Sequence, residues 1–157
     1  MRKILVAGNW KMHGSQAMVT ELLSGLLAAP GADSVDVAVF PPFPYLPLTQ
    51  SLLNDSSVAW GGQTLNPAAK GAHTGEVSAS MLLDFGCRYV LAGHSERRSL
   101  YGESDDDVAA RFATALEAGL EPVLCVGETL QEREGGQTEA VVGRQLDAVL
   151  DRCGVEG

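Results

Sequence analysis

A chain of 157 residues, of which 45% are hydrophobic, is long enough for one domain with a sizeable core. Its formal net charge of −9 argues against a nucleic-acid partner, because such binding needs clustered Lys and Arg. The cysteines at 87, 125 and 153 form no CxxC pair, which argues against a disulfide framework or a metal site and favours a cytoplasmic location. Neither a secretory signal nor a membrane-spanning apolar run is expected.

Short apolar runs and helical periodicities alternate five times along the chain. The expected strands lie at 4–7, 35–40, 58–61, 89–92 and 122–126. The expected helices lie at 15–29, with Ser15 as N-cap, and at 46–53, 79–85, 105–118 and 137–152. This alternation, with about thirty residues per unit, is typical of repeated βαβ units and a parallel sheet.

The alternation leaves two architectures open. A doubly wound sheet of five strands fits the length, whereas a complete (β/α)8 barrel usually needs about 250 residues. Strand order separates the two, since neighbours 1-2-3-4-5 indicate a barrel and 2-1-3-4-5 a doubly wound sheet. We expect residues 1–157 to form a single domain, because no linker or low-complexity tract interrupts them.

Three polar stretches follow predicted strands. His94 comes directly after the run 89–92, at a strand end where α/β folds bind ligands, although a lone histidine is more often an ordinary loop residue. Lys11 follows the first strand and suits a phosphate or a developing oxyanion, although an ordinary surface lysine fits the same pattern. The loop 62–78 is longer than an ordinary connection, and unstructured loops of this length tend to be functional or partner-bound.

Five short motifs, in order, resemble the triosephosphate isomerase family. They are Gly-Asn-Trp-Lys-Met at 8–12, Gly-Gln-Thr at 62–64, Gly-Ala-His-Thr-Gly-Glu at 71–76, Gly-His-Ser-Glu-Arg-Arg at 93–98 and Cys-Val-Gly-Glu at 125–128. The resemblance implies the N-terminal portion of a (β/α)8 barrel, with about five parallel strands and flanking helices. It also implies a cytoplasmic, glycolytic and gluconeogenic isomerase that interconverts dihydroxyacetone phosphate and D-glyceraldehyde 3-phosphate through an enediolate, without cofactor or metal.

The resemblance also implies a role for individual residues. His94 matches the electrophile that polarises the substrate carbonyl, and in this family a helix N-terminus keeps that imidazole neutral. A helical turn at 95–98 would do so here. Lys11 matches the cation that offsets charge in the transition state, and Asn9 matches a residue that hydrogen-bonds the substrate oxygen. Glu96 is expected to organise Lys11 and His94 rather than to act as the base.

The same resemblance implies that two copies of the chain form a homodimer through the loop 62–78. Thr74 matches the loop tip that enters the neighbouring subunit near its active site. Glu76 and Arg97 are then candidates for an ion pair across that interface. Cys125 is expected to pack inside the barrel without a chemical role.

The family's catalytic base has no counterpart in this sequence. That base is a glutamate in a Tyr-Glu-Pro-Val-Trp type of stretch after strand six, and neither this stretch nor the later phosphate-binding loops occur in the 157 residues. Glu128 follows the fifth strand and is expected to be structural. We therefore expect the chain by itself to be inactive, and two alternatives stay open: a truncated, non-catalytic assembly module, or a doubly wound phosphate-binding domain.

Overall fold

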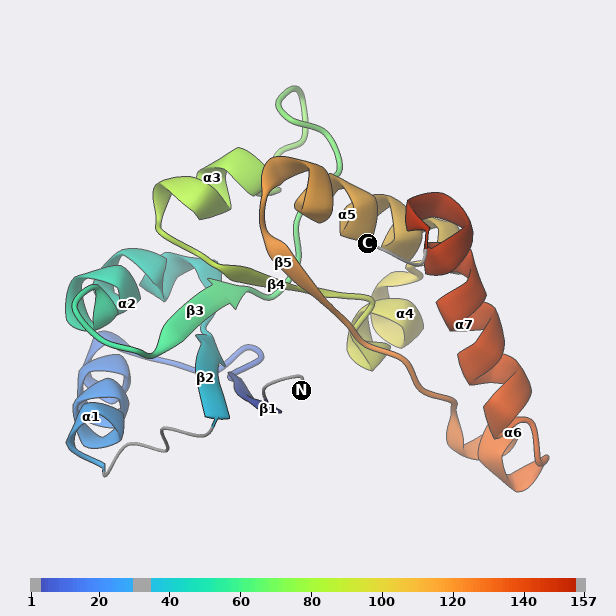
Figure 1. Cartoon of the computed structure of the whole chain (residues 1–157), viewed down its shortest axis with the longest axis horizontal. Helices are drawn as coiled ribbons and strands as arrows, with labels where there is room; N and C mark the ends of the chain where they lie inside the picture. Colours follow the sequence, from blue (N-terminus) through green and yellow to red (C-terminus); the bar gives the residue numbers. More distant parts are fainter. Residues whose placement is uncertain (1–3, 30–34, 155–157) are drawn as a thin grey trace. The chain divides into compact units, whose positions relative to one another are not determined.

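The structure, a computed structural model, describes residues 4–29 and 35–154 (Figure 1). All five predicted strands are present: β1 (Ile4–Asn9), β2 (Val35–Phe40), β3 (Ala59–Gly62), β4 (Tyr89–Ala92) and β5 (Glu121–Leu124). The five predicted helices are α1 (Gln16–Ala28), α2 (Leu46–Leu53), α3 (Ala79–Asp84), α5 (Asp105–Ala118) and α7 (Thr138–Cys153). The helical turn expected after His94 is α4 (Ser95–Tyr101), and two short helices, η1 (Phe43–Tyr45) and α6 (Leu130–Glu134), were not predicted.

The strands pair in chain order, β1-β2-β3-β4-β5. The register is parallel from β1 to β4, with Ala7 opposite Ala38 and Gly61 opposite Tyr89. A doubly wound sheet would place β1 between β2 and β3. The observed order therefore rules out that alternative and confirms the prediction of consecutive parallel strands, the order found in a (β/α)8 barrel.

The chain divides into two compact units. The first comprises residues 1–63 and 80–90, and the second comprises residues 64–79 and 91–157. The division falls inside β4, between Val90 and Leu91. The expectation of a single domain over residues 1–157 stays a prediction.

The first unit has its core between the strands and α1 and α2. Phe40, Leu23 and Leu53 are fully buried. A Cβ at Gly61 would overlap the backbone carbonyl of Tyr89, so only glycine permits β3 and β4 to approach this closely. This close approach is why the third strand carries a glycine in its interior.

The second unit has its core beside α5 and α7, which pack together (Figure 1). The helix α5 begins with a capping box, in which Ser104 Oγ accepts from the Asp107 N–H at 3.1 Å and Asp107 Oδ2 accepts from the Ser104 N–H at 3.0 Å. Val141 and Val149 of α7 are buried. Leu146 and Leu150, which share the predicted apolar face of α7, are 39% and 44% exposed.

The first strand is largely exposed. It pairs with β2 on one side, and no described strand pairs with its other side. Ile4 and Val6, which point to the same face of β1, are 66% and 52% exposed. Among the described residues, no helix has both the length and the apolar character that crossing a membrane requires.

Candidate active site

The loop after β1 holds Lys11 in a left-handed backbone conformation. Its φ is +53°, and a non-glycine residue held in that region costs of order 1–3 kcal/mol. The Lys11 N–H donates to Asn9 Oδ1 at 2.9 Å, and Gln63 Nε2 donates to the Lys11 and Phe40 carbonyls, both at 2.8 Å. The first unit therefore fixes Lys11 by contacts on both of its peptide groups. Only the Nδ2–H groups of the Asn9 amide can donate, so any acceptor oxygen that Asn9 binds has to meet Nδ2.

His94 is the N-cap of α4. Its Nδ1 accepts the backbone N–H of Glu96 at 3.3 Å, and its side chain is 23% exposed. A nitrogen that accepts a hydrogen bond carries no proton, so this contact assigns the proton of the neutral ring to Nε2. The helical turn expected at 95–98 is thus present, and it leaves His94 with an Nε2–H donor, the group needed to polarise a carbonyl.

Glu96 lies beside His94. Its Oε2 is 3.5 Å from His94 Nδ1, and its side chain is 43% exposed. An ion pair between Glu96 and His94 would need a proton on Nδ1, and a protonated Nδ1 could not accept the Glu96 N–H. The backbone contact is the shorter of the two, so we take it as the contact that sets the tautomer. The proximity of Glu96 to His94 supports an organising role. Lys11 belongs to the other unit, so a joint action of Glu96 on Lys11 stays a prediction.

The turn before His94 depends on Gly93 and Arg98. Gly93 has φ +74°, and a Cβ there would lie 2.6 Å from Val108 Cγ1 and 2.8 Å from Arg98 Nη2. Arg98 Nε donates to the Gly93 carbonyl at 2.8 Å, and its Nη1 lies 2.6 Å from Asp105 Oδ1. The backbone of this turn therefore needs a glycine, and the Arg98 guanidinium covers it.

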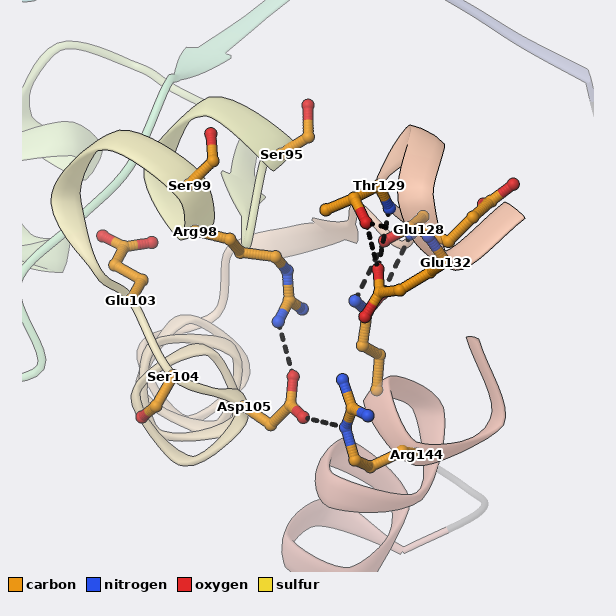
Figure 2. A pocket seen from close by; sticks show the side chains of 12 residues that line it. Ser95, Arg98, Ser99, Glu103, Ser104, Asp105, Glu128, Thr129, Glu132 and Arg144 are labelled. Carbon is orange, nitrogen blue, oxygen red and sulfur yellow. Dashed lines mark hydrogen bonds and ion pairs between the residues drawn. The ribbon is translucent and has the colours of Figure 1, made fainter. Parts of the chain in front are cut away.

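A pocket of about 570 Å³ lies beside this turn in the second unit (Figure 2). Its walls come from α4, the start of α5, the loop after β5, α6 and α7. Figure 2 shows Arg98 and Arg144 reaching Asp105 from opposite sides, and Arg144 Nε lies 2.9 Å from Asp105 Oδ2. Burial raises the pKa of Asp105, but the hydrogen bonds from Arg144 and Arg98 outweigh it, so the pKa of this carboxyl is lowered.

Glu128, on the pocket wall, is held by neighbours in its own segment. Its Oε1 accepts from Arg133 Nε at 2.7 Å and from Thr138 Oγ1 at 3.4 Å, and its side chain is 8% exposed. The hydrogen bond from Arg133 is the main reason that the pKa of Glu128 is lowered. A carboxylate tied in this way fits the structural role expected for it and is poorly suited to proton abstraction.

The residues predicted for a dimer interface lie in the second unit. Thr74 and Glu76 are exposed, and Glu76 Oε2 accepts from Asn66 Nδ2 at 3.0 Å. Arg97 Nε lies 2.6 Å from Glu103 Oε1. Glu76 and Arg97 thus each have a partner within the chain, and an ion pair between them across an interface stays a prediction.

Sequence reasoning gave no role to several residues that support the site. Gln63 and Arg98 lie within the quoted motifs, and that membership was the available signal for them. Glu103, which is 8% exposed, carries no such signal. It binds Arg97, and its Oε1 is 3.3 Å from Arg111 Nε, while Arg111 also donates to the Leu65 carbonyl. This buried network ties α4, α5 and the loop before α3 together.

The cysteines at 87, 125 and 153 are free. Burial raises the pKa of Cys87 to about 12. Burial also raises the pKa of Cys125, with a smaller opposing effect from Arg98. A thiol with a raised pKa is a poor nucleophile at neutral pH, which agrees with the absence of a chemical role expected for Cys125.

Comparison with known proteins gives one consistent result. The family model for triosephosphate isomerase matches residues 4–157. The triosephosphate isomerases of Thiobacillus denitrificans and Dechloromonas aromatica are 61% and 60% identical over 155 residues, and that of Hydrogenovibrio crunogenus is 54% identical over 160 residues. Each alignment covers 99% of this chain and 62% of the relative, so the chain spans about 62% of the length of these relatives. The chain belongs to the triosephosphate isomerase family.

Proposed function

We propose that the protein interconverts dihydroxyacetone phosphate and D-glyceraldehyde 3-phosphate. The observation that carries this proposal is the contact at His94, whose Nδ1 accepts the Glu96 N–H at 3.3 Å, which assigns the proton of the neutral ring to Nε2. A neutral imidazole donor strengthens its hydrogen bond as a carbonyl oxygen becomes an enediolate oxygen. The reaction needs this kind of stabilisation because the intermediate carries new negative charge on that oxygen.

Lys11 and Asn9 supply the complementary interactions in this proposal. The Lys11 ammonium offsets the charge of the phosphate and the enediolate, and Asn9 donates to the substrate oxygen. The left-handed conformation of Lys11 supports the assignment, because strained backbone held by surrounding contacts tends to occur at functional sites. Glu96 organises His94 in the same scheme.

Proton abstraction needs a base that these 157 residues do not supply. The sequence contains no counterpart of the family's glutamate, and Glu128 is held by Arg133 and Thr138. Loss of a general base costs on the order of 10²–10⁴ in rate. We therefore propose that the 157-residue chain binds its ligand and polarises the ligand's carbonyl but turns over glyceraldehyde 3-phosphate slowly. Turnover at the rate of a complete isomerase would contradict this.

Ligand binding tests the function more directly than turnover. The probe is phosphoglycolohydroxamate, an enediolate mimic, titrated into the isotope-labelled chain while the His94 imidazole and the Lys11 amide are followed by NMR. We expect both to shift, and we expect His94→Gln and Lys11→Met each to weaken binding. The matched control is Arg152→Met, which removes an exposed cation near the end of α7, and this variant should bind as the parent does.

A double-variant cycle shows whether the two residues act on one ligand molecule. If they do, the losses from His94→Gln and Lys11→Met will not be additive in the double variant. Additive losses would mean independent sites. Binding that is equally strong in parent and double variant would contradict the proposed function and favour a non-catalytic assembly module.

We further propose that the protein is a cytoplasmic homodimer joined through the loop 62–78. The base of this loop is closed by the Asn66 N–H, which donates to the Val77 carbonyl at 2.8 Å, while residues 69–76 are exposed. Such a loop presents a defined tip, with Thr74 on it, to another molecule. Sedimentation of the parent and of Thr74→Arg tests this, since a charged tip should weaken the dimer. Equal sedimentation of a dimeric parent and its variant would contradict the assignment.

A further inference from the structure

We propose that Arg98 is a positioning residue for His94, and that Asp105 and Arg144 hold Arg98 in place. The inference rests on the proposed function in one respect, which is that His94 is the group that meets the substrate. All four residues belong to the second unit. Their arrangement fixes the direction of the His94 imidazole, whose own hydrogen bond from the Glu96 N–H is long.

The first observation is that Arg98 binds both peptide groups that flank His94. Its Nε donates to the Gly93 carbonyl at 2.8 Å, and its backbone N–H donates to the His94 carbonyl at 3.2 Å. These two carbonyls belong to the peptide planes on either side of the His94 Cα. The Arg98 side chain therefore restrains the plane between Gly93 and His94, while the plane after His94 is held by the helix backbone, where the Arg97 N–H also donates to the His94 carbonyl, at 2.8 Å.

The second observation concerns the space around Gly93. The residue has a positive φ, and the volume that a Cβ would need is filled by Val108 and by Arg98 Nη2. Glycine adopts this conformation without strain, so the side chains packed against Gly93 are what confine the turn. The guanidinium is thus both a hydrogen-bond donor to the turn and part of the wall that confines it.

The third observation is the anchor behind the guanidinium. Arg98 Nη1 lies 2.6 Å from Asp105 Oδ1, and Arg144 Nε lies 2.9 Å from Asp105 Oδ2, as Figure 2 shows. The Arg98 and Asp105 side chains are 13% and 24% exposed, whereas Arg144 is 60% exposed. The inner pair is therefore the strong link, since a mostly buried charge left without its partner is costly, and the outer pair is weaker.

The fork of the guanidinium explains why arginine serves here. Its Nε and Nη1 point in fixed, different directions, so one group reaches the Gly93 carbonyl and the Asp105 carboxylate together. The contact from the Glu96 N–H to His94 Nδ1, at 3.3 Å, is long for a hydrogen bond. The ring therefore depends on a firmly held backbone to keep that contact.

The tautomer of the His94 imidazole is the readout, because a role in stability alone would leave it unchanged in the folded protein. Long-range proton–nitrogen NMR spectra of the labelled chain report both ring nitrogens, and His94→Gln assigns them. In the parent we expect one tautomer, with the proton on Nε2. In Arg98→Met and Arg98→Lys we expect loss of this single-tautomer signature, since lysine keeps the charge but not the fork. Asp105→Asn should give a partial loss of the single-tautomer signature, and Arg144→Met should give the smallest loss.

The matched control is Arg133→Met, which removes an arginine bound to Glu128 at 2.7 Å in the same unit. We expect the His94 nitrogens to keep their parent signals in this variant. Unchanged His94 signals in folded Arg98→Met, or equal changes in Arg133→Met, would overturn the proposal. If Arg98→Met does not fold, Arg98→Lys and Asp105→Asn decide by the same criterion. Because no ligand is added, a failure of the proposed function appears separately, in the phosphoglycolohydroxamate titration.

Discussion

In the loop after β1, the backbone conformation of Lys11 is held by a side chain from another loop, which composition and periodicity do not reveal. Lys11 has a positive φ although it is not a glycine, and the Gln63 side-chain amide donates a hydrogen bond to the Lys11 carbonyl. The motifs at 8–12 and 62–64 marked both residues, but nothing in a linear sequence shows that they meet. Contacts between residues far apart in the chain are set by tertiary packing, which is why the support of each candidate site residue could not be predicted.

The role of Gln63 can be measured through stability. Gln63→Met keeps the length of the side chain but removes the donor to the Lys11 and Phe40 carbonyls. The Phe40 carbonyl keeps the Trp10 N–H as a donor at 3.1 Å, and the Lys11 carbonyl lies at an exposed residue, so we expect the free energy of unfolding measured in urea to fall by about 0.5–1.5 kcal/mol, the net contribution of a typical hydrogen bond. Gln131→Met, at an exposed position of α6, is the control and should change stability by no more than about 0.5 kcal/mol. Equal stability of the two variants would contradict the role of Gln63.

Gly93 and Gly102 form a matched pair for the turn around His94. Their φ values are +74° and +71°, but a Cβ at Gly93 would overlap Val108, whereas one at Gly102 would meet no atom within 4 Å. Gly102→Ala should therefore cost about 1–2 kcal/mol of backbone strain. Gly93→Ala has the same backbone strain and an additional packing cost. Thermal unfolding should therefore show a clearly lower Tm for Gly93→Ala than for Gly102→Ala. Equal Tm values would mean that the turn relaxes without loss.

At the scale of helices and strands, local chemistry predicted most of what was found. Ser15 caps α1 as expected, accepting the Met18 N–H at 3.1 Å. The helix α6 was missed because five residues are too few to show periodicity, yet the capping box formed by Thr129 and Glu132 was a readable sign. β1 continues to Asn9 because that residue pairs with Phe40, and strand pairing is not visible in composition.

The capping box of α5 should make stability depend on pH. The Ser104 hydroxyl is the main reason that the pKa of Asp107 lies below its ordinary value of 3.8. A carboxyl with a lowered pKa stabilises the fold above its ordinary value, and this contribution disappears as the pH falls through the lowered pKa. Ser104→Ala should lower the Tm at pH 7 and have a smaller effect in strong acid. A constant difference in Tm across this range would contradict the assignment.

At the scale of the whole molecule, alternation predicted parallel units but not their order. A barrel and a doubly wound sheet share the same elements, and the order of the strands depends on how distant segments pair. The motifs favoured the barrel, and the strand order β1-β2-β3-β4-β5 agrees with it. Within the described residues β1 is an edge strand, and open edges are expected to leave apolar side chains without partners, with which the exposure of Ile4 and Val6 agrees.

The exposed edge of β1 should promote association of the chain with itself. Unpaired strand edges with apolar side chains are known routes to aggregation. We expect sedimentation to show higher species that grow with concentration, and we expect Val6→Glu to reduce them. Leu130→Glu, at a position that is 70% exposed in α6, is the control. A monomer at all concentrations, or equal effects of both substitutions, would contradict the role of the edge.

The closed base of the loop 62–78 has a consequence for limited proteolysis. Lys70 lies on the exposed tip, and the contacts of Asn66 with Val77 and Glu76 lie below it. Trypsin should cleave after Lys70 early in a digest, yet the two fragments should stay associated, because the cut spares the contacts that join them. Slower cleavage at higher protein concentration would then report that a second molecule covers this tip.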